Sequence, residues 1–92
     1  MITSFRHKGL SLYFASGDKR AIPAQSAARI GRILDRLEAS IQPDDMDLPG
    51  YKFHPLKGDR AGEYAVTVTG NMRITYRFNG SNAEAVNLED YH

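Results

Sequence analysis

The sequence predicts an α+β domain in which two N-terminal helices pack on one face of a small, mostly antiparallel β-sheet. Apolar residues recur at helical spacing in the first half of the chain and alternate with polar residues in the second half. Short segments rich in glycine and asparagine join the predicted strands, so sequential strands run antiparallel. The 92 residues form one domain, 1–92, with room for a modest core.

The composition is that of a globular protein and excludes several other classes. Hydrophobic residues make up 41% of the chain and charged residues 25%, which is ordinary for a soluble domain. No apolar run approaches the ~18 residues of a membrane span, and the first residues show no signal-peptide pattern. Cysteine is absent, which excludes disulfides and thiolate metal sites. We therefore expect a cytoplasmic protein.

The charge is unevenly distributed, although the net charge is only +1. Residues 1–42 carry seven Lys and Arg against three acidic residues, whereas residues 43–92 carry five against eight. The N-terminal half is therefore basic. A basic half is consistent with contact to phosphate groups, although solvated helix faces often have the same composition.

The first half of the chain predicts a short strand and two helices. Residues 2–5 alternate and contain β-forming residues. Apolar spacing predicts a helix over 8–15, and Gly17 is a suitable stop. Pro23 suits the first turn of the second helix, and Pro43 closes it. The apolar stripe of the second helix consists of Ile30, Ile33, Leu34, Leu37 and Ile41.

The opposite side of the second helix is basic. Its arginines are Arg29, Arg32 and Arg36. Arg32 and Arg36 lie one turn apart, where like charges repel mildly. Such a repulsion is consistent with a binding surface for a partner, although a solvated helix face is the simpler explanation.

The strongest β signal is a hairpin over residues 64–78. Its apolar rows are Tyr64, Val66 and Val68 on the first strand and Met72, Ile74, Tyr76 and Phe78 on the second. Both rows must face one core, so Val66 pairs with Ile74. This register leaves Thr69-Gly70-Asn71 as a three-residue loop, whose glycine or asparagine supplies a left-handed residue.

Two further strands flank the hairpin. Residues 51–54 predict a short strand that ends at Pro55, and residues 56–62 form a loop before the hairpin. After a turn at 79–82, residues 83–89 predict the last strand. The sheet therefore consists mainly of strands that follow one another in the chain.

The second face of the hairpin is polar and suits an anionic ligand. Pairing Tyr76 with Val86 places Glu89 opposite Arg73 and leaves Tyr91 on the same face, near Arg73. A tighter turn after the hairpin would shift this register by one residue. The polar residues of the hairpin are Thr67, Thr69, Arg73, Thr75 and Arg77.

The candidates for chemistry on this face each have a structural explanation as well. His54 suits a hydrogen-bonded strand end, Lys57 a solvated loop, and Arg73 a pair with a facing carboxylate. His92, as the last residue, suits a frayed terminus. The three histidines lack metal-site spacing, and the chain has neither a glycine-rich phosphate loop nor a serine elbow.

The remaining set of basic groups, histidines and a tyrosine suits metal-free RNA cleavage. In that reaction a general base removes the proton of the ribose 2′-hydroxyl. Cations stabilise the extra charge on the phosphorane, and an acid protonates the 5′ leaving oxygen. Histidine can take either proton role near neutral pH.

Four segments along the chain form a recognisable set. They are Met-Ile-x-Ser-Phe-x-His-Lys-Gly-Leu at 1–10, Tyr-Lys-x-His-Pro-Leu-Lys-Gly-Asp-Arg at 51–60, Arg73-Ile74-Thr75 and Glu89-Asp90-Tyr91-His92. In this order they resemble HigB toxins of the RelE superfamily of bacterial toxin–antitoxin modules. The resemblance implies a RelE-like ribonuclease that cuts mRNA on the ribosome without metal or cofactor, with a HigA-like helix-turn-helix antitoxin as partner. Met72 departs from the family, which often has an aromatic residue there.

The resemblance also implies the catalytic residues. Arg73 and Lys57 are expected to bind the scissile phosphate and to stabilise its transition state. His92 is expected to be the general base and His54 the acid, although the sequence does not decide which histidine takes which role. The full catalytic set carried over from the family is His54, Lys57, Arg73, Asp90, Tyr91 and His92.

The remaining assignments concern orientation and partners. Asp90 is expected to hold the C-terminal segment or the imidazole tautomer, and Tyr91 to stack on a base or orient the 2′-hydroxyl. The amide of Asn71 can pair with an adenine edge or simply serve the turn. Expected RNA contacts are Asn71, Arg77, Lys52 and Arg60. The expected antitoxin contacts are Arg29, Arg32 and Arg36.

Two functions from other classes remain open. A non-cleaving RNA-binding or ribosome-binding module would use the basic sheet face without needing both His54 and His92. An interaction protein in an operator complex would instead need the arginine face of the second helix. Mapping new mRNA 5′ ends after incubation with translating ribosomes separates these functions from cleavage.

Overall fold

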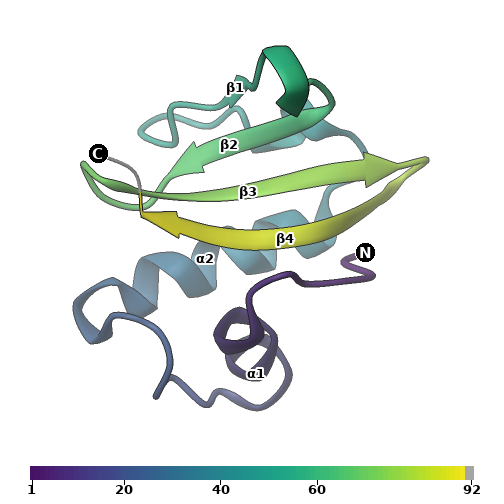
Figure 1. Ribbon diagram of the computed structural model, residues 1–92. Helices are drawn as coiled ribbons and strands as arrows, with labels where there is room; N and C mark the ends of the chain where they lie inside the picture. Colours follow the sequence, from purple (N-terminus) through teal and green to yellow (C-terminus); the bar gives the residue numbers. More distant parts are fainter. Residues whose placement is uncertain (91–92) are drawn as a thin grey trace.

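The computed structural model describes residues 1–90 and confirms the predicted fold class. Its strands form one antiparallel sheet in the order β1-β2-β3-β4. In Figure 1 helix α2 lies against one face of this sheet, and α1 lies beyond β4. The elements are α1 (Lys8–Ser16), η1 (Ala24–Ser26), α2 (Ala27–Ala39), η2 (Pro43–Met46), β1 (His54–Pro55), η3 (Gly58–Arg60), β2 (Glu63–Thr67), β3 (Met72–Asn79) and β4 (Asn82–Asp90).

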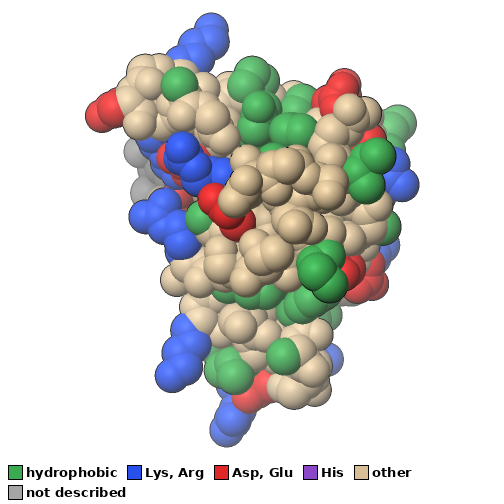
Figure 2. All heavy atoms as spheres, turned by 90° about the vertical axis from the view of Figure 1, so that its right-hand side faces the viewer, with side chains coloured by type: hydrophobic (Ala, Val, Ile, Leu, Met, Phe, Trp, Pro, Cys, Tyr) green, Lys and Arg blue, Asp and Glu red, His purple; other side chains and the backbone are tan. Residues whose placement is uncertain are grey.

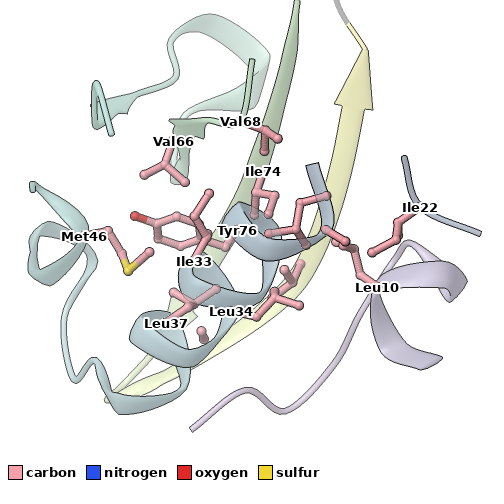
Figure 3. Packing of buried hydrophobic residues seen from close by; sticks show 14 residues of the cluster. Leu10, Ile22, Ile33, Leu34, Leu37, Met46, Val66, Val68, Ile74 and Tyr76 are labelled. Atoms are coloured by element: carbon pink, nitrogen blue, oxygen red, sulfur yellow. The ribbon is translucent and has the colours of Figure 1, made fainter. Parts of the chain in front are cut away.

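The core fills the space between α2 and the sheet. Figure 3 shows Ile33, Leu34 and Leu37 of α2 on the side where Ile74 and Tyr76 project from the sheet. These side chains are almost completely buried, and each buried apolar side chain of this size contributes about 1.5–3 kcal/mol. The predicted apolar stripe is therefore confirmed for four of its five members.

The prediction is wrong for Ile41, the fifth member of the stripe. It is 67% exposed because α2 ends at Ala39 and Ser40 already has an extended backbone. Asp45 accepts hydrogen bonds from the backbone N–H groups of Ile41 and Gln42, so the chain turns before it reaches Pro43. That proline begins η2 instead of ending the helix.

The predicted hairpin register is confirmed. Val66 pairs with Ile74, and Thr67 with Arg73. The prediction of a left-handed residue in the loop is wrong, because neither Gly70 nor Asn71 has a positive φ. The loop closes instead when the N–H groups of two successive residues, at 68 and 69, both donate to the carbonyl of Met72.

The pairing of β3 with β4 combines the two registers that the sequence left open. Arg73 faces Glu89 as predicted, but the register shifts by one residue between Thr75 and Arg77. A tight turn joins the two strands, so one residue of β4 must be absorbed along the strand. Ala85 lies in the shifted stretch and has a left-handed backbone with φ of 54°.

Two predicted strands are shorter in the structure. The segment 2–5 forms only isolated parallel bridges to β4. The strand predicted over 51–54 is displaced to His54–Pro55, because Lys52 has a φ of 51° and interrupts the extended backbone. Pro55 is tolerated because β1 is an edge strand. No helix within residues 1–90 is long and apolar enough to cross a membrane.

Replacing Ala85 with glycine is expected to raise the free energy of unfolding by about 0.5–1 kcal/mol. A left-handed backbone costs an ordinary residue about 1–2 kcal/mol, and the extra chain entropy of glycine offsets about 0.5–1 kcal/mol of that gain. Urea unfolding measures the change. Ala83→Gly is the matched control, because Ala83 is fully buried in the same strand without a positive φ; it should lose about 1 kcal/mol. Equal losses in both variants would contradict the role given to Ala85.

Candidate functional site

The polar face of the sheet is covered at its centre. Ala65 and Thr75 belong to this face, yet both are completely buried, because Arg60 reaches from η3 across the sheet to Glu89 on β4. The expectation of an open polar surface is therefore wrong for Thr75. The exposed fractions of the Arg73 and Arg77 side chains, toward the two ends of the face, are 17% and 45%.

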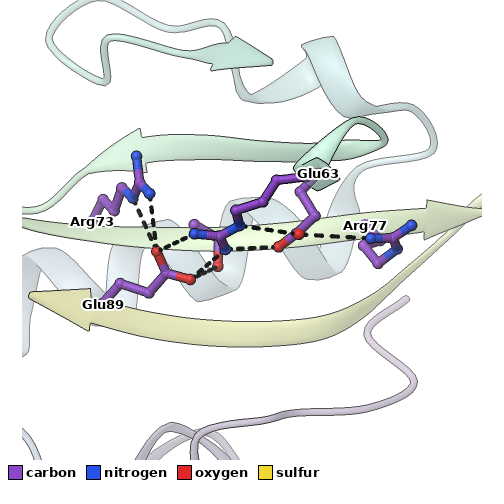
Figure 4. A network of polar contacts seen from close by, with 6 residues as sticks. Glu63, Arg73, Arg77 and Glu89 are labelled. Carbon is purple, nitrogen blue, oxygen red and sulfur yellow. Dashed lines mark hydrogen bonds and ion pairs between the residues drawn. The ribbon is translucent and has the colours of Figure 1, made fainter. Parts of the chain in front are cut away.

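Arg60 connects two carboxylates through both edges of its guanidinium group. Its Nε and Nη2 donate to the two oxygens of Glu63 at 3.1 and 2.8 Å. Its Nη1 donates to Oε1 of Glu89 at 3.0 Å, and Nη2 also donates to Oε2. Figure 4 shows the chain of contacts that runs from Arg73 through Glu89 and Glu63 to Arg77. We call the five side chains of Arg60, Glu63, Arg73, Arg77 and Glu89 the arginine–glutamate network.

Glu89 is the link between this network and Arg73. Its Oε1 accepts from Nε of Arg73 at 3.1 Å, and Nη2 of Arg73 lies 3.1 Å from the same oxygen. Thr75 donates its hydroxyl to Oε2 of Glu89 at 3.3 Å. The hydrogen bonds from Arg60, followed by those from Arg73, lower the pKa of Glu89 from 4.5 to about 2. Glu89 is therefore ionised at neutral pH.

Both glutamates were absent from the candidate site residues drawn from the sequence. The sequence did contain a signal for Glu89, because the predicted register placed it opposite Arg73. Glu63 carried a weaker signal, since it is two residues from Ala65 in an alternating strand and so lies on the polar face. The hydrogen bond from Arg60 is the main cause that lowers the pKa of Glu63.

The hairpin loop is tied to the end of β4. Nδ2 of Asn71 donates to Oδ1 of Asp90 at 3.1 Å, and Oδ1 of Asn71 accepts from the Thr69 hydroxyl at 3.2 Å. Asp90 pairs with Met72 across the sheet, so it lies one residue along β4 from the partner of Arg73. Its two neighbours in the predicted catalytic set, Tyr91 and His92, lie outside the described residues.

His54 lies on the edge strand with its ring exposed. It pairs with Ala65, which in turn pairs with Thr75, so its side chain belongs to the same face as Arg73, two strands away. Nδ1 of His54 is 2.9 Å from the Lys52 carbonyl oxygen. Because a carbonyl only accepts, Nδ1 carries the proton and Nε2 is the nitrogen that can exchange one.

The predicted lysines flank the histidine along the chain. Lys52 and Lys57 are both exposed. Lys57 precedes η3, and its carbonyl accepts from the backbone N–H of Arg60. Both lysines thus come from the segment that contains the edge strand and the loop over the polar face. In Figure 2, Lys and Arg side chains extend along one edge of the molecule.

The three arginines of α2 have different environments. Arg29 donates to the carbonyls of Thr67 and Gly50, each at 2.8 Å from Nη2, and its guanidinium carbon lies 5.2 Å from the centre of the Tyr51 ring. Arg36 donates to a backbone carbonyl in η2. Arg32 is exposed and makes no hydrogen bond or ion pair within residues 1–90. Of these three arginines, Arg32 is the one whose guanidinium group is available for a contact with the antitoxin.

A metal site is not formed by the described part of the chain. No group of three histidine or acidic side chains within residues 1–90 is arranged to hold a metal ion. The chemistry available at the site is that of Arg73, Asp90, His54 and Lys57: cationic stabilisation of an anion and proton transfer.

Comparisons with known proteins show which family and which structures this chain is similar to. Residues 3–92 match a family described as the RelE-like toxin of the type II toxin–antitoxin system HigB. The chain is 44% identical, over the full length of both proteins, to a Proteus vulgaris protein named endoribonuclease HigB.

Solved structures show the same fold at low sequence identity. A YoeB/ParE toxin from Agrobacterium tumefaciens is 21% identical with a TM-score of 0.66, and the match covers 99% of this chain and 96% of that one. YafQ from E. coli strain BL21(DE3) is 17% identical with a TM-score of 0.59, and the match covers 98% and 91%.

Removing the Glu89 carboxylate is expected to reduce the acid sensitivity of the fold. The pKa of Glu89 is lower in the folded protein than the ordinary value of 4.5. Its stabilisation is therefore complete above about pH 4.5 and is lost as the pH falls toward about 2. In urea unfolding from pH 7 to pH 3, Glu89→Gln should show a smaller loss of unfolding free energy than the wild type, by at most about 2 kcal/mol.

Glu84→Gln is the matched control for this experiment. Glu84 lies on the same strand but makes no hydrogen bond or ion pair within residues 1–90. It should keep the wild-type dependence on pH. A Glu89→Gln variant with the wild-type dependence would show that the ion pairs of Glu89 do not stabilise the fold.

Proposed function

This chain belongs to the HigB family of RelE-like toxins of type II toxin–antitoxin systems, and from that premise we propose that it is an endoribonuclease that cleaves mRNA on the ribosome. Cleavage of translated mRNA inhibits protein synthesis, which accounts for toxicity. Such an enzyme acts in the cytoplasm, where ribosomes translate. The activity in the name of the Proteus vulgaris relative supports the proposal.

The observation that carries the proposal is the position of Arg73 beside the end of β4. Arg73 faces Glu89, and the next residue, Asp90, belongs to the predicted catalytic set. Ribose-assisted cleavage needs a cation at the phosphate as well as groups that transfer protons, and Arg73 supplies the cation. The 2′-oxygen attacks the phosphorus while the bond to the 5′-oxygen breaks, and the phosphorane between these states carries an extra negative charge.

Each predicted catalytic residue then has a role. Arg73 and Lys57 stabilise the phosphorane as cations. His92 takes the proton from the 2′-hydroxyl. His54 acts as the imidazolium, whose second proton, on Nε2, passes to the 5′-oxygen and leaves Nδ1–H bonded to the Lys52 carbonyl. Asp90 orients the C-terminal segment. Tyr91 stacks on a base or orients the 2′-hydroxyl.

The other predicted RNA contacts surround this centre. Lys52, just before the edge strand β1, and Arg77, on β3, are exposed cations. Both can bind phosphate groups of the RNA backbone. Asn71 holds Asp90 with its amide, so a base contact requires it to exchange this bond for one with RNA. Arg60 contributes positive charge to this surface, while its guanidinium group already binds two carboxylates.

The antitoxin partner follows from the family, and we propose a HigA-like helix-turn-helix protein. Arg32 on the exposed side of α2 is the arginine that suits an acidic antitoxin surface. Arg29 and Arg36 support the toxin fold through backbone carbonyls, so their contribution to the antitoxin is secondary. RNA and antitoxin would then contact different faces of the toxin.

Replacing His92 with glutamine is expected to slow cleavage by about 10²–10⁴, the usual contribution of a proton-transfer group. Glutamine keeps a hydrogen-bonding side chain but cannot exchange the proton. Single-turnover cleavage of ribosome-bound mRNA measures the rate, and circular dichroism checks the fold. Lys19→Gln, in an exposed loop, is the control with wild-type activity. Full cleavage by a folded His92→Gln variant would remove His92 from the mechanism and leave His54 as the central histidine.

Replacing Arg32 with glutamate is expected to weaken antitoxin binding at least ~10-fold, because it reverses a charge at a proposed contact. Isothermal titration with the purified antitoxin measures the affinity, and the thermal midpoint should stay within about 2 °C of the wild type. Arg29→Ala provides the contrast: it should lower the midpoint, since it removes the bonds to Thr67 and Gly50. Unchanged affinity in Arg32→Glu would place the docking surface elsewhere.

A further inference from the structure

We propose that Glu89 and Arg60 are positioning residues that orient the guanidinium group of Arg73 toward the RNA phosphate and preserve its positive charge. This inference rests on the proposed role of Arg73 in RNA cleavage. Glu89 contacts Arg73 directly, and Arg60 contacts Glu89, so both belong to the arginine–glutamate network.

Glu89 determines the orientation of Arg73. A guanidinium group is planar, and two of its nitrogens, Nε and Nη2, lie 3.1 Å from a single oxygen of Glu89. This contact engages the Nε edge of the plane, so the plane cannot rotate without breaking a charge-assisted hydrogen bond. With 17% of its side chain exposed, Arg73 is held in a defined direction at the edge of the covered face.

Glu89 itself is held in place from its other side. Arg60 donates to both of its oxygens, and the buried Thr75 hydroxyl donates to Oε2. The carboxylate therefore has one orientation, in which Oε1 is directed at Arg73. Support of this kind around a functional cation is what keeps catalytic geometry within a fraction of an ångström.

Arg60 also solves a problem of charge. A lone Glu89–Arg73 pair would be neutral, and a neutral pair attracts a phosphate only weakly. Arg60 shares the negative charge of Glu89, while Glu63 is shared by Arg60 and Arg77. Three guanidinium groups and two carboxylates leave the network with one net positive charge. Arg73 is thus both fixed by a carboxylate and still part of a cationic group.

The test compares Arg60→Lys with the wild type. Lysine keeps the charge but has no planar fork, so it cannot bind both oxygens of Glu89 and both of Glu63. We expect the maximal single-turnover rate on ribosome-bound mRNA to fall about 10- to 100-fold, the effect of misplacing a catalytic group by about 1 Å. The toxin concentration at half-maximal rate should change less than ~3-fold, because the net charge is kept. Glu89→Gln should lower the rate in the same way.

Two controls separate positioning from charge and from folding. Arg77→Gln removes one positive charge from the same network without contacting Glu89, so it should alter half-saturation more than the maximal rate. Arg20→Gln removes an exposed charge that pairs with Asp18 away from the network, and it should behave as the wild type. If Arg60→Lys does not fold, Thr75→Val removes one bond to Glu89 and should show the same effect on a smaller scale.

A second readout does not depend on cleavage. The Nε–H resonance of Arg73 in nitrogen-15 NMR spectra should shift and exchange faster with water in Arg60→Lys and Glu89→Gln, and remain in place in Arg20→Gln. A wild-type protein that cleaves no ribosome-bound mRNA would refute the proposed function, while this resonance would still decide the positioning. A resonance unchanged in both network variants, or a rate loss no larger than that of Arg77→Gln, would overturn the inference.

Discussion

The carboxylate of Glu89 is the group on which the polar face of this protein depends. It receives hydrogen bonds from Arg60, Arg73 and Thr75, so the loop over the face, the hairpin and the last strand meet at one side chain. Charges in such a covered position are costly unless each is paired and hydrogen-bonded. Arg60 meets that condition by binding two carboxylates at once, which is why the loop that carries it closes over the sheet.

The second helix serves the site as well as the core. Its apolar stripe anchors the sheet through almost completely buried side chains, and this burial gives the polar face a rigid base. From the other side of the helix, Arg29 binds the carbonyl of Thr67, the residue that pairs with Arg73. It also binds Gly50, at the start of the segment that leads to His54. One helix therefore supports Arg73 from below and fixes the approach of the edge strand.

The candidate site is assembled from the ends of strands, where backbone geometry is set by the sheet and side chains still reach solvent. Arg73 lies near the beginning of β3 and Asp90 at the end of β4. In the antiparallel register Arg73 pairs with Glu89, the residue before Asp90. The hairpin loop joins this arrangement through Asn71. A site built in this way needs no cavity, and it suits an extended substrate such as an mRNA strand.

The sequence by itself determined the α+β class and the apolar stripe of α2 as far as Leu37, because periodicity reports which face of an element meets the core. It offered the pairing of Arg73 with Glu89 as one of two registers, and the folded sheet decided between them. It could not determine where elements end, so Ile41 was placed in the core and residues 51–54 in a strand. It also did not connect Arg60 with Glu89: residues 29 positions apart show no local pattern, and only the folded sheet brings them together. For the same reason Arg29 looked like a surface cation, although the tertiary structure gives it two backbone carbonyls. Hydrophobic patterning is local and survives in the sequence, whereas the pairing of buried charges is decided by contacts that exist only after folding.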